Sequence, residues 1–126
     1  MTARTILLID DDDLFRKAVR LSLERAGHTV IEAGEGNEGL KCYKSNRCDV
    51  VVTDVIMPGK EGLETIRELK SLDPAVKIIA VSGGGRLDSR DYLPMAKAFG
   101  AARILDKPFS EQALLEAIEA LANGAP

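Results

Sequence analysis

Four consecutive aspartates, Asp10 to Asp13, follow an apolar run near the start of the chain, and three further polar residues end later apolar runs. These are Asp54 after VVVT, Ser82 after IIAV and Lys107 after RILD. Unit negative charges about 4 Å apart repel by roughly 4 kcal/mol at an effective dielectric constant near 20, so clustered carboxylates need a counter-charge. An acidic pocket without His or Cys ligands suits Mg²⁺, which leaves coordination positions open for phosphate oxygens. Together with a lysine, such a pocket favours phosphoryl chemistry.

The elements that must position these residues alternate regularly along the chain. Apolar runs predict five β-strands, over Thr5–Ile9, Thr29–Ile31, Val50–Thr53, Lys77–Val81 and Arg103–Leu105. The first helix is predicted from a stripe of residues that recur with i, i+3, i+4, i+7 spacing, with Gly27 at its C-terminal cap. These residues are Phe15, Ala18, Val19, Ser22, Leu23 and Ala26. Four more helices are predicted over Gly39–Lys44, Gly62–Leu72, Pro94–Phe99 and Glu111–Leu121, the last with Ser110 as its N-cap.

This alternation predicts a three-layer, doubly wound α/β fold. Strands that are nearly continuous in Val, Ile and Leu are buried on both faces, which indicates a five-stranded parallel sheet covered by five helices. Ligands of such sheets bind beyond the carboxyl ends of the strands, at the point where the strand order reverses. With the strand order 2-1-3-4-5, the first and third strands are neighbours, so Asp10, Asp11 and Asp54 are expected to share one pocket.

Length, charge and cysteine content narrow the range of functions. A chain of 126 residues is expected to form one domain over residues 1–126. Its formal net charge of −3 gives no electrostatic footprint for nucleic acid, so direct DNA binding is not expected. The sequence has neither a membrane span nor a signal-peptide pattern, so we expect a cytoplasmic protein. Cys42 and Cys48 are expected to be free thiols, and His28 a surface residue.

Four motifs resemble, in order and spacing, those of the response-regulator receiver domain of two-component systems, whose fold is CheY-like and flavodoxin-like. They are LLIDDDD, VVVTDVIMPGKEG, IIAVSGGG and ILDKPF, and the resemblance covers essentially the whole chain. It implies that Asp54 is a phosphoacceptor that takes its phosphoryl group from a phosphohistidine donor. It also implies a Mg²⁺ site with the protein ligands Asp10, Asp11, Asp54 and the backbone carbonyl of Ile56.

The resemblance also implies roles for residues at the ends of the fourth and fifth strands. Ser82 would bind a phosphoryl oxygen. Lys107 would pair with the phosphoryl group and, before that, with the acidic pair. Pro108 would follow a cis peptide bond, which is costly except before proline.

Position along the strand-to-helix turn divides the four aspartates. Asp10 and Asp11, nearest the strand end, are the expected metal-site carboxylates, with Asp11 as a direct ligand and Asp10 acting through water. Asp12 or Asp13 is expected to cap the first helix and complement its dipole, a contribution of about 1 kcal/mol.

Two departures from the family pattern affect the expected switch. Ile104 stands where most members of the family carry a Tyr or Phe, so the usual coupling to an aromatic rotamer is in doubt. The stretch from Ser82 to Phe99 is a few residues longer than usual, with Pro94 expected in the first turn of a short fourth helix. We therefore hypothesise that reordering of residues 83–91 carries the switch.

Surface residues indicate partners. Leu14 and Leu21 fall off the buried stripe of the first helix, beside Arg16, Lys17, Arg20 and Arg25, and this face is expected to dock a histidine kinase or phosphotransfer domain. The alternative is a merely solvated charged face. The fifth helix carries Glu111, Glu116 and Glu119 outward. It could serve either output or a homodimer through the face of the fourth helix, fifth strand and fifth helix. No output domain is expected in this chain, so output would lie in a downstream protein or elsewhere in a parent chain.

Two alternatives of other classes stay open at this point. A haloacid-dehalogenase-type phosphatase would use Asp10 and Asp12 as its Asp-x-Asp pair with Ser82 and Lys107 as later partners, but it gives Asp54 no role. A pseudo-receiver would be a binding module that never takes phosphate. The favoured interpretation is a signalling protein that is not an enzyme on other substrates, although it catalyses its own phosphorylation and dephosphorylation.

Overall fold

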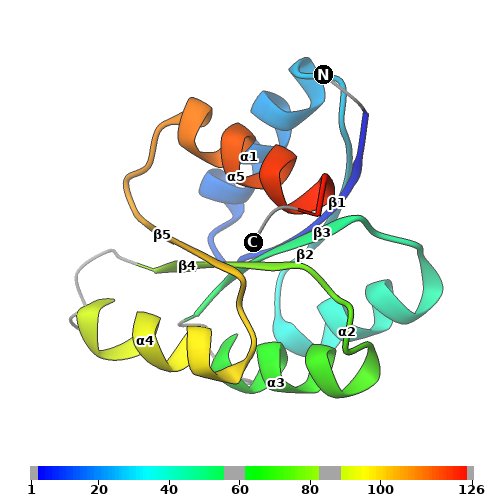
Figure 1. Ribbon diagram of the computed structural model, residues 1–126. Coiled ribbons are helices and arrows are strands. Elements are labelled where there is room, and N and C mark those ends of the chain that lie inside the picture. Colours follow the sequence, from blue (N-terminus) through cyan, green and yellow to red (C-terminus); the bar gives the residue numbers. More distant parts are fainter. Residues whose placement is uncertain (1–2, 56–61, 83–88, 125–126) are drawn as a thin grey trace.

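The computed structural model describes residues 3–55, 62–82 and 89–124, leaving aside the side chains of residues 82 and 89–93. Strands and helices alternate throughout these ranges (Figure 1). The strands are β1 (Thr5–Ile9), β2 (Thr29–Ala33), β3 (Val50–Asp54), β4 (Ile78–Ser82) and β5 (Arg103–Asp106). All five predicted strands are therefore present, most of them extended by one or two residues at the carboxyl end.

The helices confirm the predicted alternation but not every predicted boundary. They are α1 (Asp13–Arg25), α2 (Gly36–Ser45), α3 (Gly62–Leu72), α4 (Ser89–Phe99) and α5 (Glu111–Ala122). Helix α1 ends as expected, because Gly27 adopts φ 98° just beyond the C-cap residue Ala26. Within the predicted stripe of α1, Val19 and Leu23 are buried whereas Ala18 is exposed.

The strands form one parallel sheet in the order β2-β1-β3-β4-β5, which is the predicted order. Ile9 of β1 lies opposite Thr53 of β3, so the residues that follow these two strands emerge side by side at one edge of the sheet. That edge is the carboxyl edge of every strand, because the sheet is parallel throughout.

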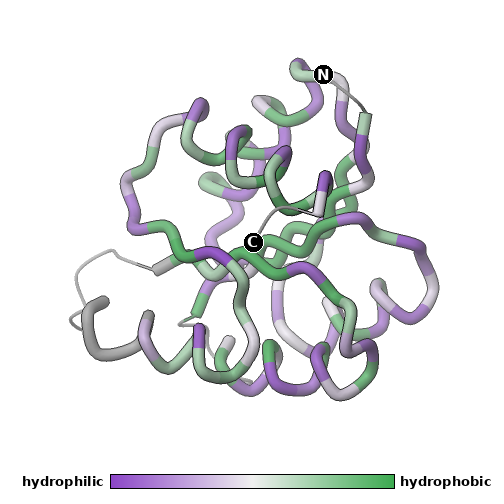
Figure 2. Tube along the Cα trace, viewed as in Figure 1, coloured by the Kyte–Doolittle hydropathy of each residue, from purple (hydrophilic) through white to green (hydrophobic). Residues whose placement is uncertain are grey.

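Alternation along each strand builds two separate cores. In β1, Leu7 and Ile9 belong to one buried cluster, whereas Ile6 and Leu8 belong to the other. The first cluster lies under α2, α3 and α4, and the second lies under α1 and α5, so the sheet is the middle of three layers (Figure 1). Figure 2 shows the same arrangement as a hydrophobic centre between helices with hydrophilic outer faces. This arrangement confirms the doubly wound α/β fold.

His28 is buried, which corrects its predicted place on the surface. Its imidazole is 4% exposed, and Nδ1 accepts a hydrogen bond from the backbone N–H of Arg4 at 3.1 Å. Arg4 lies beside it because its carbonyl oxygen accepts a hydrogen bond from the Thr29 N–H, at the start of the β1–β2 pair. The partner of His28 is thus 24 residues away in sequence, and local pattern gives no sign of it.

Helix α4 is longer than predicted, and Pro94 lies within it. The helix begins at Ser89, so Pro94 is its sixth residue and does not lie in the first turn. A proline has the backbone φ of a helix but removes one intrahelical hydrogen bond, and Pro94 is exposed. The sequence rule that places proline at a helix start is a preference that this helix overrides.

Two further predictions concerned the cysteines and a possible membrane span. Cys42 and Cys48 are free thiols, as predicted. Among the described residues, no helix has the length and apolar character needed to span a bilayer.

Candidate functional site

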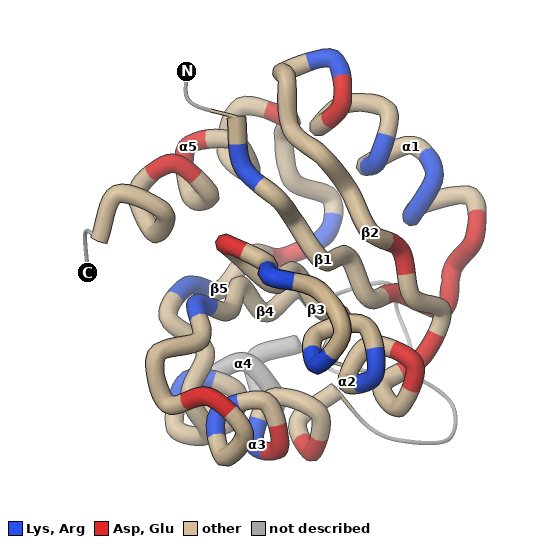
Figure 3. Tube along the Cα trace, turned by 90° about the vertical axis from the view of Figure 1, so that its right-hand side faces the viewer, with Lys and Arg blue, Asp and Glu red and all other residues tan. Residues whose placement is uncertain are grey.

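The carboxyl edge of the sheet gathers the predicted acidic residues. Asp10 directly follows β1, Asp54 is the last residue of β3, and Lys107 directly follows β5. Figure 3 shows the acidic segment that leads into α1, close to a second acidic segment at the end of β2. Residues from three strands therefore meet at the point where the strand order reverses, where doubly wound sheets bind ligands.

Three carboxylates lie close enough together to share one cation. Asp10, Asp11 and Asp54 each offer an oxygen, and these oxygens lie within 4.8 Å of one another. Oxygens bound to a single Mg²⁺ at about 2.1 Å are at most roughly 4.2 Å apart, so small adjustments would suffice. The cluster contains oxygen donors alone, which suits a hard cation. Asp10 and Asp54 are buried and Asp11 is exposed, so the cluster is reached from the Asp11 side.

Lys107 supplies the nearest positive charge. Its Nζ lies 3.0 Å from Asp10 Oδ2 and 3.1 Å from Asp54 Oδ2, and the side chain is 16% exposed. Burial by itself would lower the pKa of Lys107, but the charge of Asp54 and the hydrogen bond that Lys107 donates to Asp10 outweigh it and raise that pKa above its usual value of 10.5. The ammonium is therefore fully charged at neutral pH. Three carboxylates face one ammonium, so the cluster keeps a net negative charge.

Phe15 also belongs to the site, although the sequence predicted it only as a core residue of the first helix. The Lys107 Nζ lies 4.0 Å from the centroid of the Phe15 ring, a cation–π contact. Phe109 meets the same ring edge-on, with centroids 5.8 Å apart. Both phenylalanines pack against the core below α1 and α5. The pair therefore forms an apolar wall that holds the lysine over the acidic cluster.

Asp10 is held at every hydrogen-bonding group. Its N–H donates to the carbonyl of Ala33 at 3.1 Å, its Oδ1 accepts from the Asp12 N–H at 2.9 Å, and its Oδ2 accepts from Lys107. Its backbone carbonyl accepts from Arg16 Nη1 at 2.6 Å. The carboxylate of Asp10 consequently has one fixed orientation. Asp11, which is exposed, is the neighbour with room to reach a cation directly.

Asp12 is the N-cap of α1, which confirms one of the two predicted capping residues. Its side chain accepts a hydrogen bond from the Phe15 N–H at 3.1 Å. Asp13 is the first residue of the helix and pairs with Arg16 at 2.7 Å. The aspartate run is thus divided between the cluster and the helix start, as its order along the turn predicts.

A glycine lets helix α3 approach the strand that carries Asp54. A Cβ built on Gly62 would lie 2.0 Å from the carbonyl oxygen of Asp54 and 2.6 Å from the Cα of Val55. The Gly62 N–H donates to the Val55 carbonyl at 2.9 Å. The backbone after β3 therefore leaves no room for a side chain at Gly62, and the position of Asp54 depends on this contact.

The predicted basic face of α1 is only partly basic. Arg16 bonds Glu32 Oε1 at 2.9 Å, and Arg20 bonds both Glu32 Oε2 and Glu24. Their positive charges are matched within the fold by acidic neighbours. Leu14 and Leu21 are 83% and 59% exposed, as predicted.

Several predicted site residues are only partly described. Ile56 and residues 83–88 of the predicted switch segment 83–91 lie outside the described residues, whereas residues 89–91 begin α4 and are not part of a loop as predicted. The backbone of Ser82 ends β4, opposite Asp106 of β5, at the same sheet edge as the cluster. Ile104 packs against the core under α2, α3 and α4, so an aliphatic side chain fills the position where an aromatic residue was expected. The Lys107–Pro108 peptide bond is cis, as predicted.

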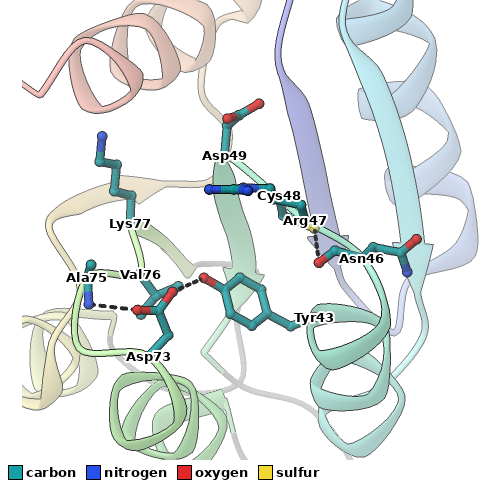
Figure 4. Close-up of a pocket in the computed structure, with 9 residues that line it drawn as sticks. All are labelled: Tyr43, Asn46, Arg47, Cys48, Asp49, Asp73, Ala75, Val76 and Lys77. Carbon is teal, nitrogen blue, oxygen red and sulfur yellow. Dashed lines mark hydrogen bonds between the residues drawn. The ribbon is translucent and has the colours of Figure 1, made fainter.

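A second hollow lies at the opposite edge of the sheet, between the turns that precede β3 and β4 (Figure 4). Its volume is about 390 Å³, and Tyr43, Cys48, Asp49 and Asp73 line part of it. Its carboxylates already have partners, because Asp73 accepts from Tyr43 Oη at 2.6 Å and Asp49 accepts from the Thr5 N–H at 2.7 Å. The first bond joins α2 to the turn after α3, and the second joins β1 to the turn before β3, so both are structural contacts.

The fold and the site together define a class of protein. It is a doubly wound α/β domain whose polar residues lie where the strand order reverses. Residues 6–119 match the family model described as "Response regulator receiver domain". The chain therefore belongs to the response regulator receiver domain family of two-component signalling. This membership does not favour the phosphatase alternative, and in the structure Asp12 caps α1.

Relatives of known name and structure agree with this family. The chain is 34% identical over 116 residues to the transcriptional regulatory protein CseB of Streptomyces avermitilis, covering 92% of this chain and 48% of CseB. It is 31% identical over 116 residues to the chemotaxis protein CheY of Halobacterium salinarum, covering 92% of this chain and 94% of CheY. A response regulator receiver domain structure from Clostridium thermocellum superposes with a TM-score of 0.88 at 34% identity, covering 95% and 94% of the two chains. The chain spans half or less of the length of the transcriptional regulators it matches.

Proposed function

We propose that Asp54 is the phosphoacceptor of this receiver domain and that the chain takes a phosphoryl group from a phosphohistidine donor. The observation that carries the proposal is the Lys107 ammonium, which bridges Asp54 and Asp10 at 3.1 Å and 3.0 Å beside Asp11. A carboxylate that accepts a hydrogen bond from a half-buried ammonium, at the ligand edge of the sheet, is placed as a nucleophile for phosphoryl transfer.

The acidic cluster fits Mg²⁺ as the cofactor. Its donors are carboxylate oxygens within 4.8 Å of one another, and its net charge is negative. Asp11 and Asp54 would hold the ion directly, and Asp10 would hold it through water, with the backbone carbonyl of Ile56 as a further ligand. When bound, Mg²⁺ neutralises the charge of phosphoryl oxygens and orients them toward the nucleophile.

The chemistry then falls to residues of the chain. A carboxylate oxygen of Asp54 forms the bond to phosphorus as the bond from phosphorus to the donor nitrogen breaks, and the donor leaves with the electron pair. Lys107 pairs with the developing charge on the phosphoryl oxygens, and the Ser82 hydroxyl binds one of them. The chain thus catalyses its own phosphorylation and dephosphorylation and acts on no other substrate.

Phosphorylation would change the contacts of Lys107, because the new group adds negative charge and acceptor oxygens beside it. Lys107 follows β5 directly, so its movement would be transmitted to β5 and to the helices that flank it. With Ile104 in place of an aromatic residue, we propose that the segment 83–91 carries the switch. A partner protein, or an output domain elsewhere in a parent chain, would read it.

We propose one domain over residues 1–126, a cytoplasmic location, and a donor surface on α1. The exposed side chains Leu14, Lys17 and Leu21 form that surface, next to the cluster. A histidine kinase or a phosphotransfer domain is the partner that fits its function. A homodimer would use the face of α4, β5 and α5.

Intact-mass spectrometry with a small phosphodonor tests the proposal. The wild-type chain should gain one phosphoryl group with acetyl phosphate and Mg²⁺, and should gain none when Mg²⁺ is chelated. The variant Asp54→Ala should gain none, whereas Asp12→Ala should still react. A folded wild-type chain that binds Mg²⁺ but gains no mass would identify a pseudo-receiver and contradict the proposal.

A further inference from the structure

We propose that Arg16 is a positioning residue for the carboxylate of Asp10 and thereby sets the affinity of the cluster for Mg²⁺. This inference rests on the proposed function. Arg16 does not reach the cluster with its own charge, because it contacts Asp10 through the backbone carbonyl on the far side of that residue. Its effect on a bound cation would therefore pass through the orientation of Asp10.

The guanidinium of Arg16 joins three elements at once. Its Nη1 donates to the Asp10 carbonyl at 2.6 Å, its Nη2 pairs with Asp13 at 2.7 Å, and its Nε donates to Glu32 at 2.9 Å. These partners follow β1, begin α1 and lie on β2, respectively. The side chain is 12% exposed, so it is held within the fold. A planar fork of fixed donors is suited to bonding three acceptors in fixed directions.

The position of Asp10 depends on this fork. The turn from β1 to α1 is held by the bonds to Ala33, Asp12 and Lys107, and the bond from Arg16 is the one that fixes the carbonyl. Without it, the peptide group after Asp10 would lose the contact that holds its carbonyl, and the turn that carries the Asp10 and Asp11 side chains would loosen. The carboxylates would then spend less time in the arrangement that one cation can bridge.

A positioning role and a charge effect predict opposite results when Arg16 is replaced. Removing a positive charge near an acidic cluster strengthens cation binding by Coulomb's law. Removing a residue that orients a metal ligand weakens metal binding, by about tenfold or more in comparable sites. The sign of the change in Mg²⁺ affinity therefore separates the two explanations.

Arg20 provides a matched control on the same helix. It pairs with the same Glu32 and is also an arginine, but its other partner among the described residues is Glu24, and it does not bond Asp10. The variants Arg16→Met and Arg20→Met remove the same charge and each remove one arginine from Glu32. Arg16→Lys keeps the charge and an aliphatic stem but lacks the planar fork of donors that bonds the three acceptors in fixed directions.

Amide NMR titration with Mg²⁺ measures the Kd of each variant and reports in the same spectra whether the fold is intact. We expect Arg16→Met to weaken Mg²⁺ binding by about tenfold, and Arg16→Lys to weaken it as well. We expect Arg20→Met to bind at least as tightly as the wild type. Arg16→Lys keeps the experiment decisive if Arg16→Met does not fold.

Three results would overturn the proposal. Unchanged or tighter Mg²⁺ binding in a folded Arg16 variant would show that Arg16 positions nothing. Equal weakening in Arg20→Met would assign the effect to Glu32 or to stability. Absence of Mg²⁺ binding in the wild-type chain would overturn the proposed metal site itself, and so differs from a failure of Arg16 alone.

Discussion

Each aspartate in the run from Asp10 to Asp13 has its own set of contacts, and these contacts decide what its loss would do. Asp10 is 2% exposed and bonded to Lys107, whereas Asp11 is exposed beside it. Asp12 bonds the N–H of Phe15, and Asp13 pairs with Arg16. Four identical side chains therefore have different structural environments within one turn of chain.

Replacement of Asp12 by alanine should lower the free energy of unfolding by about 1 kcal/mol, because an N-cap acceptor is lost from α1. Urea denaturation followed by circular dichroism measures this change. The backbone N–H of Asp12 still donates to Asp10 in the variant, so phosphorylation should persist. Equal stability of the variant and the wild type would mean that the cap does not stabilise α1.

Cys48 should react slowly with alkylating reagents in the folded protein. Burial, with smaller contributions from Cys42 and Asp49, raises the pKa of Cys48 to about 11. Burial also raises the pKa of Cys42. At pH 8 the folded chain should therefore label with iodoacetamide at least about tenfold more slowly than the urea-unfolded chain, as followed by intact mass. Rapid labelling of the folded chain at Cys48 would contradict this assignment.

Residue types and spacing predict the cluster because its members directly end buried strands. Asp54 and Lys107 are examples, since their places follow from strand ends that are visible in the sequence. The contacts of Phe15 and Arg16, and the burial of His28, were not predicted, for a different reason. Their partners Lys107, Glu32 and Arg4 are brought near only by the packing of separate elements. A periodic pattern along one helix carries no information about such contacts.

At the scale of elements, the start of α3 approaches the end of β3 closely beside the cluster. Gly62 has backbone atoms of Asp54 and Val55 within the space that a Cβ would need. A side chain at residue 62 would therefore push the start of α3 and the last residue of β3, which is Asp54, apart. Stability and site geometry are therefore coupled at this junction.

Replacement of Gly62 by alanine should lower the free energy of unfolding by about 1–3 kcal/mol, because overpacking forces the backbone apart. Chemical denaturation measures this loss. Gly34→Ala is the control, because its added Cβ would meet its nearest neighbour at an ordinary 3.6 Å and should change stability little. A Gly62→Ala variant as stable as Gly34→Ala would contradict the close approach.

Glu32 links β2 to α1 through two arginines. Burial would raise the pKa of Glu32, but hydrogen bonds from Arg20 and Arg16 outweigh it and hold that pKa below its usual value of 4.5. A carboxyl group whose pKa is lower in the folded state than in the unfolded state stabilises the fold above the unfolded value. This stabilisation is lost as the pH falls through the folded-state pKa.

The variant Glu32→Gln should therefore be less stable than the wild type at pH 7, by about 1 kcal/mol, and the difference should shrink below pH 4.5. Urea denaturation between pH 3 and pH 7 tests this dependence. Glu24→Gln, which removes only an exposed pair with Arg20, should show a much smaller difference. A difference for Glu32→Gln that grows toward low pH would contradict the sign.

The predicted elements differ from the observed ones mainly at helix starts. Helix α2 begins at Gly36 and α4 begins at Ser89, in both cases earlier than the sequence indicated. In α2, Glu35 acts as the N-cap and bonds the Glu38 N–H, a role that serine, threonine, aspartate or asparagine usually fills. In α4, the preference of proline for the first turn of a helix placed the predicted helix start too late, at Pro94. Strand order and the two-sided core were predictable because each strand alternates between two apolar clusters.

At the scale of the whole molecule, the two edges of the sheet have different roles. The edge at the carboxyl ends of the strands holds three carboxylates and Lys107 with a net negative charge. At the opposite edge, Asp49 and Asp73 are bonded to the Thr5 N–H and the Tyr43 hydroxyl, and these contacts stabilise turns. The two roles lie apart because the sheet is parallel, so every strand ends at the same edge of the sheet.

The measurement that most directly tests the central claim is the location of the phosphoryl group. The wild-type chain is treated with acetyl phosphate and Mg²⁺, reduced with borohydride, which converts an aspartyl phosphate to homoserine, and digested for peptide mass spectrometry. We predict homoserine at position 54 in the wild type and at no position in Asp54→Asn. Homoserine at position 10 or 11, or its absence from a chain that binds Mg²⁺, would contradict the assignment of Asp54 as the phosphoacceptor.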